Sequence, residues 1–399
     1  MLYIIGGKIL TMSGDIWEKG YICIEKGKIK ELGPMKNGAP FPLPAGDKVQ
    51  IINASHCVVM PGLIEAHCHM GITEEKKGME GDDCNETVNP ITPYLRAIDA
   101  INPMDAAFDD ALRAGITGAM IGPGSANVVG GSFAFVKTHG RSIDKLVIKS
   151  PAAMKVAFGE NPKVNYGDQG KSPATRMAIA AMLREELFKA SLYMEKKKKG
   201  QLKEPDFRYE CWLPVMKGKI PLKAHVHRAD DILTAIRIAR EFHLSMTLDH
   251  CSEGHLIARE VKESGFPAIV GPDLASRNKI EVQNMAFKTV GILNKAGVKT
   301  AITTDHPVSL IQALPICAGL AVKSGMEEME ALKSITLYPA QICGLGERIG
   351  SLEKGKDADI AIFDGNPLEV ATRVMCTIID GKIAYADQSF SLPASEKQV

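Results

Sequence analysis

Between residues 59 and 349, short apolar runs of strand length alternate with segments whose apolar residues recur at the three- to four-residue spacing of a helix. One unit is clear: a helical segment at 103–114 stops at Gly115 and is followed by the apolar run 116–121. Such alternation favours βα units and a parallel sheet. Enough units are present to close an eight-stranded barrel, although 125–220 does not divide cleanly into strands. Further helices are predicted at 174–199, 230–242, 255–263, 281–295 and 327–334.

The two ends of the chain show a strand pattern without helical segments. Residues 1–58 contain short β-type runs, such as 21–24 and 48–52, separated by Gly, Pro, Asn and Asp. A strand at 359–363 and a hairpin at 376–385, turning at Asp380-Gly381, give the C-terminal end the same character. We therefore predict an α/β protein: a (β/α)8 TIM-like barrel over 59–349, with residues 1–58 plus 350–399 assembled into a small β-sandwich domain.

Composition narrows the class of partner. The 399 residues carry 48 basic and 47 acidic side chains, a formal net charge of +1, so no overall attraction to nucleic acid or to an anionic membrane is expected. No uninterrupted apolar segment approaches the roughly 18 to 20 residues that span a bilayer. The nine cysteines are scattered and odd in number, as in a cytoplasmic protein with reduced thiols. We expect a small-molecule substrate, with the oligomeric state left open and a homo-oligomer among the alternatives.

Metal-capable side chains end four of the strand-like runs. The run 61–69 finishes with His67 and His69, which project from the same face of an extended strand and can bind one ion. Alone, the pair could equally be two hydrogen-bonded polar residues. Histidines or an aspartate also end the runs 220–227, 244–250 and 298–307, and this recurrence favours a metal site.

The order of these motifs resembles the amidohydrolase superfamily. The resemblance rests on an N-terminal β-segment, Pro-Gly-Leu-Ile-Glu-Ala-His-Cys-His at 61–69, later single histidines, Thr-Asp-His-Pro at 304–307 and Gly-Ser-Leu-Glu-Lys-Gly-Lys-Asp-Ala-Asp-Ile at 350–360. It covers nearly the full length of the chain. Within the superfamily, the chain is most similar to the imidazolonepropionase and cytosine-deaminase branch, and its segment 154–160 is similar to a strand of prolidase-like members.

The resemblance implies roles for particular residues. His67 and His69 would bind a metal from the first strand, and His225 would do so from the fifth. His250, on the sixth, would be either a ligand of a second metal or a hydrogen-bond donor that polarises the scissile carbonyl. Asp305, on the eighth, would contact the metal and transfer protons.

Three further positions keep alternatives open. Lys155 is a candidate carboxylated bridge between two ions and Glu160 is its rival, although either could be an ordinary salt-bridging group. His227 shares a strand face with His225 and is predicted to contact substrate, or else to be a polar residue at the barrel mouth. Possible anchors for an anionic substrate group are Lys223, Arg228 and Arg277.

Imidazole nitrogens with a carboxylate suit a divalent ion, Zn²⁺ before Fe²⁺ or Mn²⁺, with one or two ions bound. Such an ion makes water a nucleophile near neutral pH, and Asp305 is placed to carry its proton to the leaving nitrogen. We predict an amidohydrolase that cleaves a C–N bond, other than a peptide bond, of a small cyclic amide, in the manner of imidazolonepropionase. The alternatives are a prolidase-like dipeptidase with a binuclear site, a deaminase and a noncatalytic oligomeric scaffold.

Overall fold

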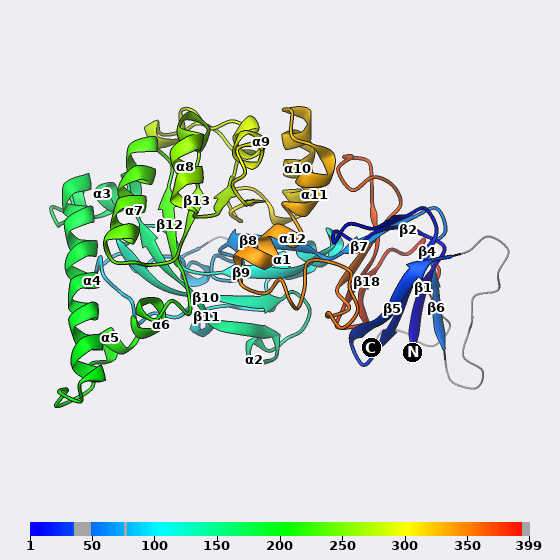
Figure 1. Cartoon of the computed structure of the whole chain (residues 1–399), viewed down its shortest axis with the longest axis horizontal. Coiled ribbons are helices and arrows are strands. Elements are labelled where there is room, and N and C mark those ends of the chain that lie inside the picture. The colour runs from blue at the N-terminus through cyan, green and yellow to red at the C-terminus, as the bar shows by residue number, and fades with distance from the viewer. Residues whose placement is uncertain (36–48, 76–77, 393–399) are drawn as a thin grey trace.

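A computed structural model describes residues 1–35, 49–75 and 78–392, with a barrel at one end of the molecule and a group of β-strands at the other (Figure 1). Eight barrel strands are hydrogen-bonded to one another in chain order. The segments that follow the first and last strands also meet, because His69 N donates to His306 O at 2.8 Å and Thr303 Oγ1 donates to His67 O at 2.6 Å. The sheet is therefore a nearly closed barrel. Its strands are β8 (Leu63–Cys68), β9 (Ile116–Ile121), β10 (Val129–Lys137), β11 (Val147–Ala157), β12 (Leu222–Val226), β13 (Met246–His250), β14 (Ala268–Val270) and β15 (Thr300–Ile302).

One barrel strand departs from the parallel sheet that the sequence predicts. β10 pairs antiparallel with both β9 and β11. The connection from β9 to β10 spans only residues 122–128, and the one from β10 to β11 spans 138–146 with the short α2 (Ile143–Leu146). A parallel crossover needs a dozen or more residues, so the chain reverses direction at both places.

Most helices lie above and to the left of the barrel strands in the view of Figure 1. In α7 (Ala229–Glu241), two acidic residues occupy the first turn, and one face, including Ile232 and Ile236, is buried. The predicted helices 103–114, 174–199, 230–242 and 327–334 are present within a few residues of their expected bounds. Besides α2 and α7, the α-helices of the described chain are α1 (Ala106–Arg113), α3 (Glu160–Gly167), α4 (Arg176–Lys198), α5 (Phe207–Glu210), α6 (Leu213–Met216), α8 (Ala258–Ser264), α9 (Lys288–Lys295), α10 (Leu314–Lys323), α11 (Glu328–Lys333) and α12 (Leu337–Ile342).

The predicted helix 281–295 is wrong at its N-terminal end. Residues Ile280–Val282 form a single 3-10 turn, and α9 begins only at Lys288. The predicted helix 255–263 likewise starts as a 3-10 turn, Gly254–Ile257, before α8. The first difference matters because it releases Glu281 from a helix surface and leaves its side chain buried.

The two ends of the chain pair with each other, as predicted. A six-stranded sheet joins β2 (Lys8–Leu10), β3 (Ile16–Trp17) and β7 (Val58–Pro61) to β16 (Ile360–Phe363), β17 (Val374–Ile379) and β18 (Lys382–Ala386). A four-stranded sheet contains β1 (Leu2–Ile5), β4 (Gly20–Glu25), β5 (Lys28–Pro34) and β6 (Gln50–Asn53). Both sheets contribute isoleucines to one hydrophobic cluster, among them Ile22 and Ile362.

The predicted hairpin is present, with β17 and β18 joined at Asp380-Gly381. The predicted domain limits and the β-sandwich arrangement stay predictions, and residues 36–48 and 393–399 of that predicted domain lie outside the described residues. Each of the nine cysteines is described and free. In the described ranges, no helix combines the length and the apolar character that a membrane crossing requires.

Candidate metal centre

The predicted ligands come together at one rim of the barrel. Parallel strands end at the same edge of a sheet, so the residues that finish β8, β12, β13 and β15 share one mouth. The strand register places these residues at a similar height along the barrel axis, since Ala157 of β11 pairs with His225 and Val226 of β12 pairs with His250. Side chains from four distant parts of the sequence thus face one space.

The first group consists of His67, His69 and Asp305. Asp305 Oδ1 lies 3.6 Å from His67 Nε2 and 3.2 Å from His69 Nε2. Oδ1 is buried and has no hydrogen bond of good geometry among the described residues. Asp305 Oδ2 lies 3.8 Å from His250 Nδ1, and the ligand atoms of His67, His250 and Asp305 fall within 4.8 Å of one another.

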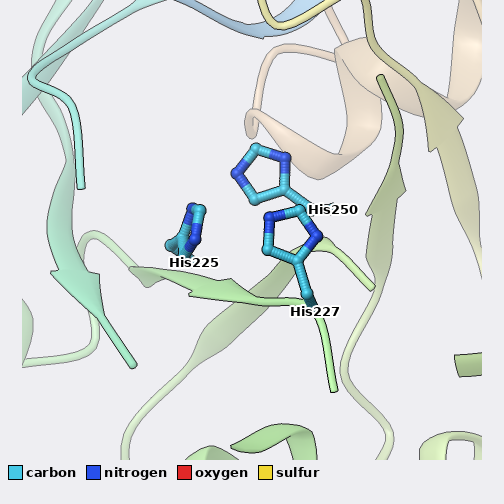
Figure 2. Close-up of side chains that lie close together, drawn as sticks. All are labelled: His225, His227 and His250. Carbon is cyan, nitrogen blue, oxygen red and sulfur yellow. The ribbon is translucent and has the colours of Figure 1, made fainter. Parts of the chain in front are cut away.

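The second group consists of His225, His227 and His250, whose imidazoles surround one point (Figure 2). Their ligand atoms also lie within 4.8 Å of one another. The rings of His227 and His250 are stacked, with centroids 4.8 Å apart and an interplanar angle of 14°. Beside this group, Glu281 Oε1 is 3.6 Å from His225 Nε2 and 3.8 Å from His227 Nε2.

Hydrogen-bond partners fix which ring nitrogen faces the centre. His69 Nδ1 lies 2.7 Å from the carbonyl oxygen of Gly122, and His250 Nδ1 lies 2.8 Å from that of Gly271. A carbonyl only accepts, so each Nδ1 carries the proton that it donates. His67 Nδ1 is 2.9 Å from Asp249 Oδ2, which favours the same tautomer. In each ring, Nε2 is left to bind an ion, as outer partners of metal-binding histidines commonly arrange.

Burial keeps most of these imidazoles neutral. It lowers the pKa of His67, His227 and His250 well below the usual range and lowers the pKa of His225 as well. Burial also acts to lower the pKa of His69, but the charges and hydrogen bonds of Cys84 and Asp305 raise it to about 10. Metal ligands must be deprotonated, so four rings are ready for an ion without losing a proton.

Lys155 lies beside the first group. Its ammonium nitrogen is 3.3 Å from His67 Nε2, the residue is fully buried, and burial lowers its pKa to about 8. Glu160 starts α3, and its backbone amide donates to Glu281 Oε2 at 2.9 Å. Glu160 is absent from both groups of metal-capable side chains in the described chain. A bridging role for Lys155 or Glu160 stays a prediction.

The three predicted substrate anchors are all engaged elsewhere. Lys223 is buried and lies 3.2 Å from Asp249 Oδ2. Arg228 forms an ion pair with Asp230, and Arg277 donates to the carbonyl oxygen of Met285. Among the described residues, the lysine in the cavity wall is Lys279, which sequence reasoning did not single out.

Glu281 and Asp249 are also site residues that the sequence analysis missed. Glu281 follows Lys279-Ile280 and precedes an amphipathic segment, so its sequence context is that of an exposed helix start. Asp249 could have been found from the sequence, because strand alternation places its side chain on the same face as Thr247 and opposite to that of His250. The hydroxyl of Thr247 donates a hydrogen bond to the Asp249 carboxylate. An acidic residue on the inner face of a buried strand needs a partner, and here that partner is His67.

A cavity of about 550 Å³ opens over both groups. This volume lies in the range of small-molecule sites. His69, His225, His227 and Asp305 lie in its wall. The remaining polar wall comes from loops and from the first turn of α3, and it includes Asn85, Ser125, Asn161, Ser276, Asn278 and Lys279.

The residues fit a divalent metal ion. The first group offers a buried carboxylate oxygen that receives no hydrogen bond of good geometry from the described residues, together with imidazole nitrogens 3.2 and 3.6 Å from it. Nitrogen and carboxylate donors are the set that Zn²⁺ and related ions take in catalytic sites. The metal-binding prediction therefore agrees with the chemistry of the donors present.

Comparison with known proteins identifies the family. The model of the Amidohydrolase family matches residues 58–384, most of the chain. The protein therefore belongs to the amidohydrolase family, as its motifs predict. Its resemblance to the superfamily is confirmed, and it is a hydrolase by family.

Individual relatives span several activities. Over 412 residues the chain is 27% identical to amidohydrolase tasK of Hapsidospora irregularis, covering 94% of this chain but only 41% of that protein. It is 24% identical to a 5-methylthioadenosine/S-adenosylhomocysteine deaminase of Symbiobacterium thermophilum, covering 97% of this chain and 94% of the deaminase. A solved amidohydrolase from Thermotoga maritima is 35% identical, with a TM-score of 0.92 over 97% of this chain and 100% of that one. These relatives share the family and differ in the reactions that their names describe.

Proposed function

We propose that the protein is a metal-dependent amidohydrolase that uses activated water to cleave a C–N bond in a small cyclic amide, with Zn²⁺ as the preferred ion. The observation that carries the proposal is the convergence of His67, His69 and Asp305, of which His69 and Asp305 line the cavity. Among the described residues, Asp305 Oδ1 receives no hydrogen bond of good geometry. Three protein ligands leave a coordination position free, which is the mark of a catalytic rather than a structural zinc site.

The bound ion would supply Lewis acidity, which makes water nucleophilic near neutral pH and polarises a carbonyl group. Asp305 then has two separate tasks for its two oxygens. Oδ1 faces His67 and His69, whereas Oδ2 is turned toward His250. Oδ2 is the atom available to take the proton of the attacking water and to return it to the departing nitrogen.

The hydrogen bond of His250 supports a role as a metal ligand over a role as a hydrogen-bond donor to the substrate. Its Nδ1 proton is committed to the carbonyl of Gly271, and burial keeps the ring neutral by lowering its pKa. A neutral imidazole with a protonated Nδ1 has a lone pair on Nε2 and no proton to give to an oxyanion. This argument supports His250 as a ligand and leaves polarisation of the carbonyl to the ion.

A binuclear, prolidase-like dipeptidase is the second candidate, favoured by one observation. Lys155 is buried 3.3 Å from His67 Nε2, and its pKa is lowered to about 8 by burial. A lysine with a depressed pKa is partly unprotonated near neutral pH, as a carboxylated lysine requires before it can form. The Lys155→Met variant separates the two functions, because the mononuclear cyclic-amide hydrolase should retain its ion.

The test is metal analysis and hydrolysis by the same preparations. The wild-type protein, loaded with Zn²⁺, should hydrolyse members of a panel of five- and six-membered cyclic amides, and His67→Ala should lose both activity and the ion. X-Pro dipeptides and aminopurines in the same panel test the dipeptidase and deaminase. Metal-loaded protein that turns over none of the cyclic amides would overturn the proposal, and turnover confined to dipeptides would move the assignment to the second candidate.

A further inference from the structure

We propose that Lys279 determines substrate specificity: its ammonium group binds a carboxylate that the cyclic amide carries near its scissile bond. The inference rests on the proposed hydrolytic function and deepens it, because it names the substrate class and the residue that recognises it. The substrate would bind with its amide at the metal centre and its carboxylate at Lys279.

Lys279 faces the same cavity as the metal centre. Among the described residues, it is the lysine of the cavity wall, which also contains His225 and Asp305. Glu281 Oε1 lies 2.6 Å from the Lys279 ammonium nitrogen and 3.6 Å from His225 Nε2. The ammonium group is therefore close enough to the histidines for one small molecule to contact both.

Two neighbours fix the ammonium group and leave one donor for a ligand. Lys279 Nζ lies 2.6 Å from Glu281 Oε1 and donates to Asn161 Oδ1 at 2.7 Å. An ammonium group has three N–H donors, so these two acceptors leave one of them for a ligand. The Lys279 side chain is 29% exposed, whereas that of Glu281 is 1% exposed. A ligand in the cavity can thus reach the cation, while the carboxylate that holds the cation stays covered.

The loop that carries Lys279 is held in place by its own contacts. Arg277 donates to the carbonyl oxygen of Met285 from Nε at 3.1 Å and from a terminal nitrogen at 2.9 Å. Ser309 Oγ donates to the carbonyl oxygen of Leu274 at 2.9 Å. A binding group that is already positioned loses little conformational entropy when its ligand arrives. These contacts favour a fixed anchor over a mobile surface lysine.

The charges around the cavity favour an anion. A divalent ion at the metal centre offsets the charge of Asp305, and the wall residue Asp82 is exposed, so water screens its carboxylate. The loop of Lys279 adds the Ser276 hydroxyl and the Asn278 amide to the wall. A carboxylate has two acceptor oxygens and can bond to the ammonium group and to one of these neighbours. A cationic substituent would instead meet like charges at Lys279 and at the ion.

The first experiment measures binding without turnover. A cyclopentanone that carries a carboxylate, and its neutral carboxamide, are titrated calorimetrically into the Zn²⁺-loaded protein; neither ring contains an amide to hydrolyse. Wild type should bind the carboxylate about 10- to 100-fold more tightly than the carboxamide. Lys279→Met should bring this affinity ratio close to one, and Lys279→Arg should retain most of it. The ratio is compared because loss of Lys279 also leaves Glu281 without its cation, which affects both ligands.

The matched control is Lys333→Met. Lys333 also pairs with a glutamate, Glu330, at 2.9 Å, and its side chain is 26% exposed, but it lies on α11, outside the cavity wall. This variant should keep the wild-type affinity ratio. An equal fall of the ratio in both methionine variants would overturn the proposal, because net charge would then explain it. A wild-type ratio in Lys279→Met would overturn it as well, since the carboxylate would then bind elsewhere, such as at the ion.

Hydrolysis separates this inference from the proposed function. A lactam that carries a carboxylate and its carboxamide should show the same preference in kcat/KM, and Lys279→Met should lose it. If the cyclopentanone pair behaves as expected but neither lactam is hydrolysed, the proposed function fails and the anion site stands. If wild type hydrolyses both lactams with equal kcat/KM values, the function stands and the role of Lys279 is overturned.

Discussion

Replacing Asp249 with asparagine should weaken metal binding and stability for two separable reasons. Asp249 is fully buried, with Oδ2 lying 2.9 Å from His67 Nδ1 and 3.2 Å from the ammonium of Lys223. The carboxylate therefore holds the proton of His67 on Nδ1 and also balances a buried cation. An amide can do neither as well.

The magnitudes follow from these two contacts. Loss of an outer partner of a metal-binding histidine typically lowers affinity about 10- to 100-fold, which is about 1.4 to 2.7 kcal/mol. Leaving Lys223 buried without its anion should cost about 3 to 5 kcal/mol of unfolding free energy. Adding Lys223→Met removes the stranded cation, so the double variant should regain most of the stability and none of the metal affinity.

Affinity is measured by competition with a chromophoric chelator, and stability by urea unfolding of the metal-free protein. The control is Glu186→Gln. This change breaks the ion pair between Arg208 and the buried Glu186 of helix α4, so it should lower stability without changing metal affinity. Wild-type metal affinity in Asp249→Asn would refute the reasoning. Recovery of affinity together with stability in the double variant would refute it too, since it would mean that His67 responds only to loosening of the fold.

Three further predictions concern other parts of the chain. Burial raises the pKa of Asp273 to about 7, so the folded state keeps a proton that the unfolded state has released, and stability falls as pH rises from about 4 to 7. Asp273→Asn should remove this slope in urea unfolding and be about 1 to 3 kcal/mol more stable than wild type at pH 8; an unchanged slope would exclude the explanation. Gly122→Ala would place a Cβ 2.2 Å from the Phe133 ring and should lower the free energy of unfolding by about 1 to 3 kcal/mol. It should also weaken metal binding, because the carbonyl of Gly122 orients His69. A wild-type thermal midpoint and wild-type affinity in chelator competition would contradict this prediction. Lys137→Met should destabilise the protein by about 3 to 5 kcal/mol, because the buried ammonium is surrounded by the carboxylates of Asp357, Asp359 and Asp380. A wild-type urea midpoint would disprove this prediction.

The barrel could be predicted from the sequence where the local pattern and the tertiary environment agree. β8, β12 and β13 are apolar runs that end in candidate metal ligands, so the local pattern predicts both the strand and its burial. β14 has three residues and α10 is apolar on most positions, so neither shows a period long enough to be recognised. β10 and β11 could not be divided because their connections carry no full helix, and that same feature turns β10 antiparallel.

The site divides in a similar way. His67, His69, His225, His250 and Asp305 could be proposed because each ends a recognisable strand. Their hydrogen-bond partners could not be predicted, because His69 and His250 donate to the backbone carbonyls of Gly122 and Gly271. A backbone acceptor leaves no signal in the residue type. Glu281 was hidden for a different reason: its contacts with the histidines depend on the loop before α9, whose conformation no short sequence pattern specifies.

Selection among amidohydrolase substrates should depend on the cavity wall rather than on the ligands. The ligands report the reaction centre that family members have in common, whereas the wall is built by loops. In this chain, the wall offers amide, hydroxyl and ammonium groups, from Asn161, Ser276 and Lys279 among others. A substrate that covers these partly exposed groups without hydrogen-bonding to them would remove their water, a cost of about 1 to 3 kcal/mol for each group so covered. Cyclic amides bearing a second polar or anionic group should therefore have kcat/KM values at least about tenfold above those of plain lactams of the same ring size, since 1.4 kcal/mol corresponds to a factor of ten. Equal kcat/KM values across such matched pairs would mean that the wall does not select the substrate, and that ring shape at the ion is the only discriminator.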